Sequence, residues 1–266
     1  MRIIKINMGE KFSIKEKFQK VFYPLLYLLT VVVFIISGVF VFQSLYYTKI
    51  YVNGNSMAPT LIGNTSKRVH YGIADNHESA LKNLNRFDVV ITYYPDTWTA
   101  DTETYKIKRV WGFPGETLYL QKLDDGSCFF TAKRGEETVY SIQGTPVNKT
   151  FESYGDLTVM KFVTDKKTFY TRIPYVNLKD EDAISRLSPR IISNFTLNDG
   201  TTPSEQEYFL MGDNWTDSSD SYSNRNKTAR INFSHLQGKV VSIQGTAKLV
   251  NGELKETNTS GAMNNF

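Results

Sequence analysis

The feature that most constrains this chain of 266 residues is an uncharged apolar run near its N-terminus. Residues 21–42 read VFYPLLYLLTVVVFIISGVFVF, 22 residues without a charged side chain. A helix of this length spans about 33 Å, enough for the roughly 30 Å hydrocarbon core of a bilayer. Pro24 is expected in the first turn, where its missing N–H costs little. A buried core helix and a cleaved signal peptide are the alternatives, but the run is longer than a signal-peptide core. We predict a transmembrane anchor at 21–45.

The positive charge of the chain is concentrated before this run. Residues 1–20 carry six basic and two acidic side chains, out of totals of 31 Lys or Arg and 27 Asp or Glu. The remaining 25 basic and 25 acidic residues cancel, which argues against a body that binds nucleic acid. The positive-inside rule predicts that residues 1–20 form a cytoplasmic tail and that the residues after the anchor lie on the extracytoplasmic side of the membrane.

The segments after the anchor predict a mainly β domain at 46–250. Runs rich in branched and aromatic residues alternate with breakers such as Pro114-Gly115. Two segments have a helical composition, 78–84 and 180–187, and the polar tail at 251–266 is expected to be flexible. The clearest strands are expected at 88–94, 117–123, 156–164, 168–176, 207–212 and 239–250.

Neither disulfide nor metal chemistry has support in the sequence. Cys128 is the only cysteine, so no intrachain disulfide can form. No group of cysteines and histidines has the spacing of a metal site. The three histidines, His70, His77 and His235, lie in no recognisable catalytic setting. We expect no cofactor and no metal.

Ser56 lies in the stretch NGNSMAPTL, shortly after the predicted anchor. By itself this stretch predicts only a polar turn. A serine without a histidine can nevertheless act as a nucleophile when a lysine accepts its proton, provided that burial keeps the lysine neutral. Lys106 and Lys108 are candidates, in the predicted strand of TYKIKRVWGFPGETL (104–118). A solvated basic edge strand would have the same pattern.

A third stretch, YFLMGDNWTDSSDSYSNR at 208–225, reads as an apolar strand followed by a polar turn rich in Asp and Ser. On its own it predicts a loop built on Asx-turns. A calcium loop is disfavoured, because the ligand spacing and the closing glutamate of an EF-hand are absent.

In this order behind an anchor, the three stretches resemble bacterial type I signal peptidases, a family of serine–lysine membrane endopeptidases. GNSMAPTL matches the serine box of that family, KRVWGFPGE its lysine box, and GDNWTDSSDS its Gly-Asp-Asn…Ser-x-Asp-Ser box. RFDVV (86–90) resembles the intervening strand. The resemblance covers about residues 20–120 and 205–247. It implies an antiparallel β-sheet or β-barrel-like catalytic body with an N-terminal transmembrane helix and a variable β insert at about 120–205.

The resemblance also implies roles for individual residues. Ser56 would be the nucleophile and Lys108 the general base, with Lys106 at a position where relatives often have an aromatic residue in the substrate groove. Ser218 corresponds to a hydroxyl that hydrogen-bonds the lysine. Asp213 and Asp220 would support the site, most simply by pairing with Arg109.

The oxyanion hole and the substrate pocket follow from the same comparison. The backbone N–H of Ser56 would be one oxyanion donor. Gly54 stands where some relatives have a second, hydroxyl donor, so a backbone group or a water must replace it. Met57, Pro59 and Ile107 would shape the turn and the pocket. The chain departs from the family pattern at Phe87, which replaces a glycine before Asp88.

The function implied by the resemblance is removal of N-terminal signal peptides from secreted preproteins that emerge from the secretion translocon, at the outer face of the cytoplasmic membrane. Its partners would be these preproteins and membrane lipid, with no nucleic acid. Three alternatives stay open. A self-cleaving repressor-like peptidase would be soluble. A catalytically silent relative acting as a chaperone for surface-fibre assembly would be expected to lose the Ser or the Lys. A plain tethered β interaction domain would leave the three stretches unexplained.

Overall fold

The fold was analysed in a computed structural model, in which the chain divides into two compact units, residues 1–46 and 47–266. The structure describes residues 13–64, 68–94, 105–122, 128–140, 148–154, 157–164, 166–171, 194–214, 217–221, 230–250 and 253–258.

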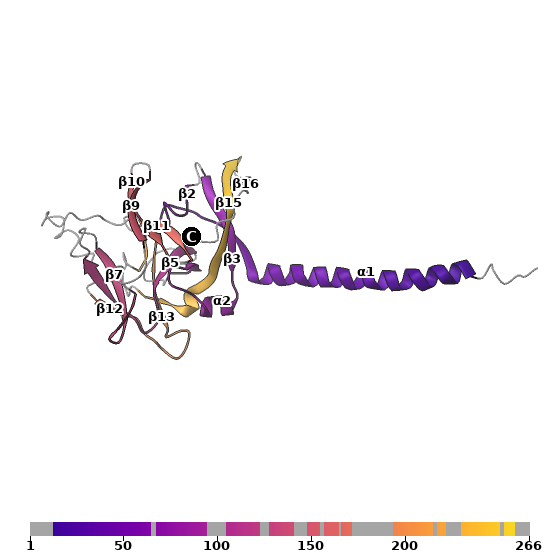
Figure 1. Cartoon of the computed structure of the whole chain (residues 1–266), viewed down its shortest axis with the longest axis horizontal. Helices are drawn as coiled ribbons and strands as arrows, with labels where there is room; N and C mark the ends of the chain where they lie inside the picture. The colour runs from indigo at the N-terminus through magenta and orange to yellow at the C-terminus, as the bar shows by residue number, and fades with distance from the viewer. Residues whose placement is uncertain are drawn as a thin grey trace, which may run out of the picture. The chain divides into compact units, whose positions relative to one another are not determined.

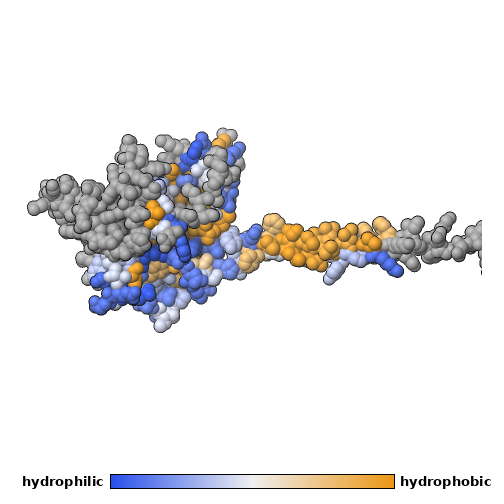
Figure 2. All heavy atoms as spheres, in the orientation of Figure 1, coloured by the Kyte–Doolittle hydropathy of each residue, from blue (hydrophilic) through white to orange (hydrophobic). Residues whose placement is uncertain are grey.

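The first unit contains one long helix, α1 (Ser13–Tyr46). Its segment Phe18–Tyr46 is long and apolar enough to cross a membrane, and Figure 2 shows hydrophobic residues along most of its length. The predicted N-terminal apolar helix is therefore confirmed. The position expected for Pro24 is wrong, because the helix begins eleven residues earlier and Pro24 lies inside it. Residues 13–20 are mostly good helix formers, so the helix continues beyond the apolar run.

The second unit is built on a nine-stranded antiparallel sheet (Figure 1). Its main path runs β1-β3-β15-β4-β5-β13-β14, while β2 pairs with β3 and β16 pairs with β15. A short helix, α2 (Glu78–Lys82), and a 3-10 turn, η3 (Phe233–His235), connect its strands. The strands are β1 (Tyr47–Tyr51), β2 (Gly63–Asn64), β3 (Arg68–Asp75), β4 (Val89–Thr92), β5 (Lys106–Gly112), β13 (Glu207–Met211), β14 (Ile231–Asn232), β15 (Leu236–Val250) and β16 (Glu253–Asn258).

Two smaller antiparallel sheets lie mostly within the range in which the β insert was expected. One has the order β12-β6-β7-β8 and the other β11-β10-β9. Their strands are β6 (Thr117–Lys122), β7 (Cys128–Arg134), β8 (Glu137–Tyr140), β9 (Asn148–Tyr154), β10 (Leu157–Val163), β11 (Thr168–Thr171) and β12 (Asn194–Thr196). The mainly antiparallel β fold is thus confirmed. The helix expected at 180–187 and the end of the strand expected at 168–176 lie outside the described residues.

The C-terminal tail differs from the prediction. Residues 253–258, which were expected to be flexible, form β16 and pair with β15 from Val250–Glu253 to Thr246–Asn258. The sequence between the two strands is Asn251-Gly252, the dipeptide that most favours a two-residue hairpin. The polar composition of the tail concealed this signal, because both strands carry charged residues on an exposed face.

Phe87 connects the main sheet to the two smaller ones. Its φ of 69° lies in the left-handed region, which residues with a side chain rarely adopt. Its buried ring packs against Trp111 of β5, Tyr140 of β8 and Phe169 of β11, with ring centroids 5.0, 5.2 and 5.1 Å away. This aromatic packing joins three sheets and offsets the backbone strain, which is of the order of 1–3 kcal/mol.

We predict that Phe87→Gly will be more stable than Phe87→Ala, although glycine is the smaller residue. Both variants lose the buried ring, at a cost of about 3–5 kcal/mol. Only glycine also relieves the left-handed strain, by about 1 kcal/mol. The midpoint of thermal unfolding in detergent should therefore decrease in the order wild type, Phe87→Gly, Phe87→Ala. Equal midpoints for the two variants would show that the backbone at this position is not strained.

Candidate active site

Ser56 lies in a turn between β1 and β2 that is held down by two buried side chains. Met57 and Leu61 are fully buried in a core cluster with Val52, Val89, Val240 and Ile243. The turn is closed by Leu61 N, which donates to Met57 O at 2.9 Å. Gly54 enters it with a φ of 80° and donates to Gly63 O. The Met57 side chain points into the core, and the neighbouring Ser56 side chain points away from it and is partly exposed.

The segment after β13 packs against this turn. Asn214 N donates to Ser56 O at 2.9 Å, and Asn214 Nδ2 donates to Asn55 O at 3.2 Å. Gly212 allows the close approach, because a Cβ there would clash with both Ser56 O and Ser218 Oγ. The stretches NGNSMAPTL and GDNWTDSSDS are therefore in direct contact in the folded chain.

Lys108 brings the middle stretch to the same point. It lies on β5, its side chain is buried, and its Nζ is 2.9 Å from Ser56 Oγ and 3.0 Å from Ile107 O. The pKa of Lys108 is lowered to about 8, mainly by burial; Asp220 and Asp213 oppose this shift, and the charge of Lys106 contributes to it. A lysine with this pKa is neutral in about a tenth of the molecules at pH 7 and in about half of them at pH 8, far more than a lysine of ordinary pKa.

Arg109, the next residue on β5, points the other way and forms a buried ion pair. Its Nε and Nη2 donate to the two carboxylate oxygens of Asp213 at 2.7 and 2.6 Å, and both side chains are fully buried. Nη1 donates to Phe87 O at 2.8 Å. The guanidinium carbon lies 3.9 Å from the centre of the Phe169 ring. Of the two aspartates expected to pair with Arg109, Asp213 and Asp220, the one that forms the ion pair is Asp213.

The two other residues predicted to support the site occupy different positions. Asp220 is buried, and its Oδ2 accepts a hydrogen bond from Gly212 N at 2.9 Å. Ser218 Oγ is also buried but has no hydrogen-bond partner in the described part of the chain. The hydrogen bond expected between Ser218 and Lys108 is therefore not formed, although Ser218 lies beside Gly212 and the Ser56 turn.

Tyr94 is a residue of the site that the sequence analysis missed. The centre of its ring lies 6.0 Å from Lys108 Nζ, and its hydroxyl donates to Ser219 O. Burial raises the pKa of Tyr94 well above its usual value. The apolar ring helps to keep water away from the Lys108 amine. No sequence signal marked it, because it stands at the end of a run of strand-forming residues.

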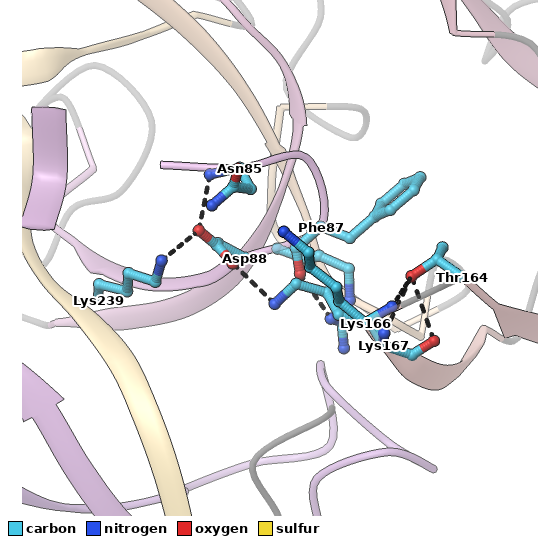
Figure 3. Close-up of polar contacts among 8 residues, drawn as sticks. Asn85, Phe87, Asp88, Thr164, Lys166, Lys167 and Lys239 are labelled. Carbon is cyan, nitrogen blue, oxygen red and sulfur yellow. Dashed lines mark hydrogen bonds and ion pairs between the residues drawn. The ribbon is translucent and has the colours of Figure 1, made fainter. Parts of the chain in front are cut away.

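Asp88 forms a second polar cluster behind the site. Figure 3 shows its carboxylate between two lysines, with Lys167 on Oδ1 and Lys239 on Oδ2, each at 2.7 Å. Asn85 N also donates to Oδ2 at 2.7 Å. Burial alone would raise the pKa of Asp88, but these hydrogen bonds lower it. Because Lys167 follows the turn between β10 and β11, this cluster fixes that hairpin to the start of β4 and to β15.

The same hairpin also contacts the Ser56 turn. Thr60 Oγ1 donates to Tyr170 O at 2.8 Å and accepts from Tyr170 N at 2.9 Å. Together with Phe169 beneath Arg109, these contacts place the β10–β11 hairpin against the turn that carries Ser56 and the strand that carries Lys108. No local sequence pattern indicates these contacts, because they join residues as far as 110 positions apart.

A groove of about 610 Å³ opens beside Ser56. Gly54, Ser56, Ile107 and Lys108 line it, whereas Met57 and Pro59, which were also expected at the pocket, are buried and are not among its lining residues. The other lining residues are Thr48, Lys49, Ile50, Tyr51, Asn53, Asn76, Ile91, Tyr105, Lys106 and Gln237. Within the described part of the chain, no group of three His, Cys, Asp or Glu side chains could hold a metal ion.

Comparison with known protein families agrees with this geometry. The family described as signal peptidase, peptidase S26, matches residues 24–244, which include all three stretches and both smaller sheets. No curated protein matches the chain. The family match extends over most of the sequence, from α1 to β15. The protein therefore belongs to the peptidase S26 family of signal peptidases.

Proposed function

We propose that this protein is a membrane-anchored serine endopeptidase that cleaves N-terminal signal peptides from secreted preproteins with a Ser56–Lys108 dyad. The observation that carries the proposal is the 2.9 Å distance from Lys108 Nζ to Ser56 Oγ, with the lysine buried. A nucleophile within hydrogen-bond distance of a base of lowered pKa is the arrangement that covalent catalysis requires. Membership of a signal peptidase family supports the substrate class.

The mechanism follows from the positions of these groups. Neutral Lys108 accepts the Ser56 proton while Oγ attacks the scissile carbonyl. The ammonium then returns this proton to the leaving amine, and an acyl-enzyme remains on Ser56. Lys108 next takes a proton from a water that attacks the ester, and the ammonium returns this proton to Ser56 Oγ as the acyl product leaves, which regenerates both groups. The backbone N–H of Ser56 is the proposed oxyanion donor, and Gly54 contributes no hydroxyl to the hole.

The open edge of β5 suggests how the substrate binds. β5 pairs with β4 from Lys106 to Arg109, but its pairing with β13 begins only at Arg109. On that second side, residues 106–108 have no strand partner among the described residues, and the groove runs past them. An extended peptide could therefore add to this edge by backbone hydrogen bonds and bring its carbonyl to Ser56. Family resemblance implies small side chains at positions −1 and −3 of the substrate.

The location of the activity rests on α1 and on the charges before it. We propose residues 21–45 as a single-pass anchor and residues 1–20 as a cytoplasmic tail. In this orientation the body at 46–250 works on the extracytoplasmic side, where signal peptides emerge from the translocon. The substrate and the surrounding lipid are then the expected partners.

We predict that Ser56→Ala and Lys108→Ala will each lower turnover by about 1,000-fold or more. The assay is cleavage of a signal-peptide-bearing precursor by the detergent-solubilised full chain, read as a discrete shorter product. Both variants should keep the wild-type unfolding midpoint within a few degrees. A Lys108→Ala enzyme that cleaves at the wild-type rate, beside an inactive Lys106→Ala enzyme, would refute the dyad. No cleavage by the wild type would favour a catalytically silent relative that acts as a chaperone.

The pH dependence should report the protonation of Lys108. Only the neutral amine accepts the Ser56 proton, so kcat/KM should rise with pH and level off above the pKa of about 8. The measurement is kcat/KM for a substrate without groups that titrate in this range. A profile that stays flat from about pH 6.5 to 9.5 would exclude Lys108 as the base.

Ser218→Ala separates a functional role for that hydroxyl from a structural one. Removing a buried hydroxyl without a partner should leave the protein equally stable or slightly more stable. If Ser218 orients Lys108 during the reaction, kcat should nevertheless fall by about ten-fold or more, with little change in KM. Ser219→Ala, at an exposed neighbour, is the matched control. Unchanged kcat in Ser218→Ala would remove Ser218 from the site.

A further inference from the structure

The groove beside Ser56 has an unusual charge. Of the described residues that line it, three are lysines, Lys49, Lys106 and Lys108, and none is an aspartate or glutamate. A groove that only received apolar or small side chains would have no need of cations. The three lysines are not equivalent, because their charges are compensated to different extents.

The amines of two of the three lysines are occupied by contacts within the protein. Lys49 on β1 forms an ion pair with Glu256 of β16, and its amine also lies 4.9 Å from the centre of the Tyr71 ring. Lys108 is buried, and its amine lies in hydrogen-bond contact with Ser56 Oγ at 2.9 Å and with Ile107 O at 3.0 Å. Neither amine is therefore free to pair with a charged side chain of a bound molecule.

Lys106 is the exception. It is partly exposed, and it makes no ion pair with any carboxylate of the described residues. It pairs with Thr92 in the sheet, as Lys108 pairs with Val90, so the two lysines stand on the same face of β5. Residues two apart on a strand are separated by about 6.6 Å. Both lysines line the same groove, and the charge of Lys106 contributes to the lowered pKa of Lys108.

We propose that Lys106 binds a carboxylate side chain of the substrate at position +2, two residues after the residue whose carbonyl Ser56 attacks, since position −3 on the other side takes a small side chain. This inference rests on the proposed function and assigns a substrate preference to the same site. Side chains two apart in an extended peptide point to the same side with the spacing that separates Lys106 from Lys108. An aspartate or glutamate at that place would meet the cation in the groove, whereas lysine or arginine would be repelled.

The test compares precursor peptides that differ only by Asp against Asn at single positions on either side of the scissile bond. The protein is the full chain in a non-ionic detergent, so that no anionic lipid competes. The variants are Lys106→Gln, which removes the charge, Lys106→Arg, which keeps it, and Lys106→Glu, which reverses it. Lys255→Gln is the control for net charge, because Lys255 is exposed on β16 and does not line the groove.

At position +2, the wild type should cleave the Asp peptide about three- to ten-fold more efficiently in kcat/KM than the Asn peptide. Lys106→Arg and Lys255→Gln should keep this ratio, Lys106→Gln should bring it to one, and Lys106→Glu should invert it. The wild-type ratio should decrease with added salt. A wild-type ratio of one at position +2, or a ratio that survives Lys106→Gln, overturns the proposal. Cleavage of neither peptide by the wild type would instead contradict the proposed function.

Discussion

The buried ion pair between Arg109 and Asp213 is the interaction on which the candidate site depends. Both side chains are fully buried, so each charge is compensated mainly by the other. Loss of one partner would leave an uncompensated charge in the interior, which typically costs about 3–5 kcal/mol. Lys108 directly precedes Arg109, and Asn214, which holds the Ser56 carbonyl, directly follows Asp213. One ion pair therefore helps to fix the positions of both Lys108 and Ser56.

The β10–β11 hairpin stabilises the same arrangement from behind. Phe169 lies under the Arg109 guanidinium, Lys167 binds Asp88, and Tyr170 binds Thr60 of the Ser56 turn. The hairpin belongs to the region between the lysine and aspartate stretches, which carries none of the three motifs. The region therefore has a structural role, because the hairpin contacts β4, β5 and the Ser56 turn and fixes their relative positions.

The sequence was sufficient for features that depend on local pattern. The apolar run, the strands rich in branched residues and the three stretches all follow from neighbouring residues. It was not sufficient for features that depend on distant partners, such as Lys167 on Asp88 or the ring of Tyr94 beside Lys108. Met57 was expected in the pocket but lies in the core, since alternation along a turn does not reveal which side is buried. The Asn251-Gly252 signal was present in the sequence but was outweighed by the polar composition of the tail.

The ion pair between Lys49 and Glu256 joins residues 207 positions apart, one on β1 and the other on β16. At about 5–20 residues per second, a ribosome needs roughly 10–40 s to add the chain between them. Ser56 is made at the beginning of this interval, whereas Gln237 of β15, which lines the groove, and Glu256 of β16, which pairs with the lining residue Lys49, are made near its end. A nascent chain thus carries Ser56 for most of its synthesis before the groove beside it is complete.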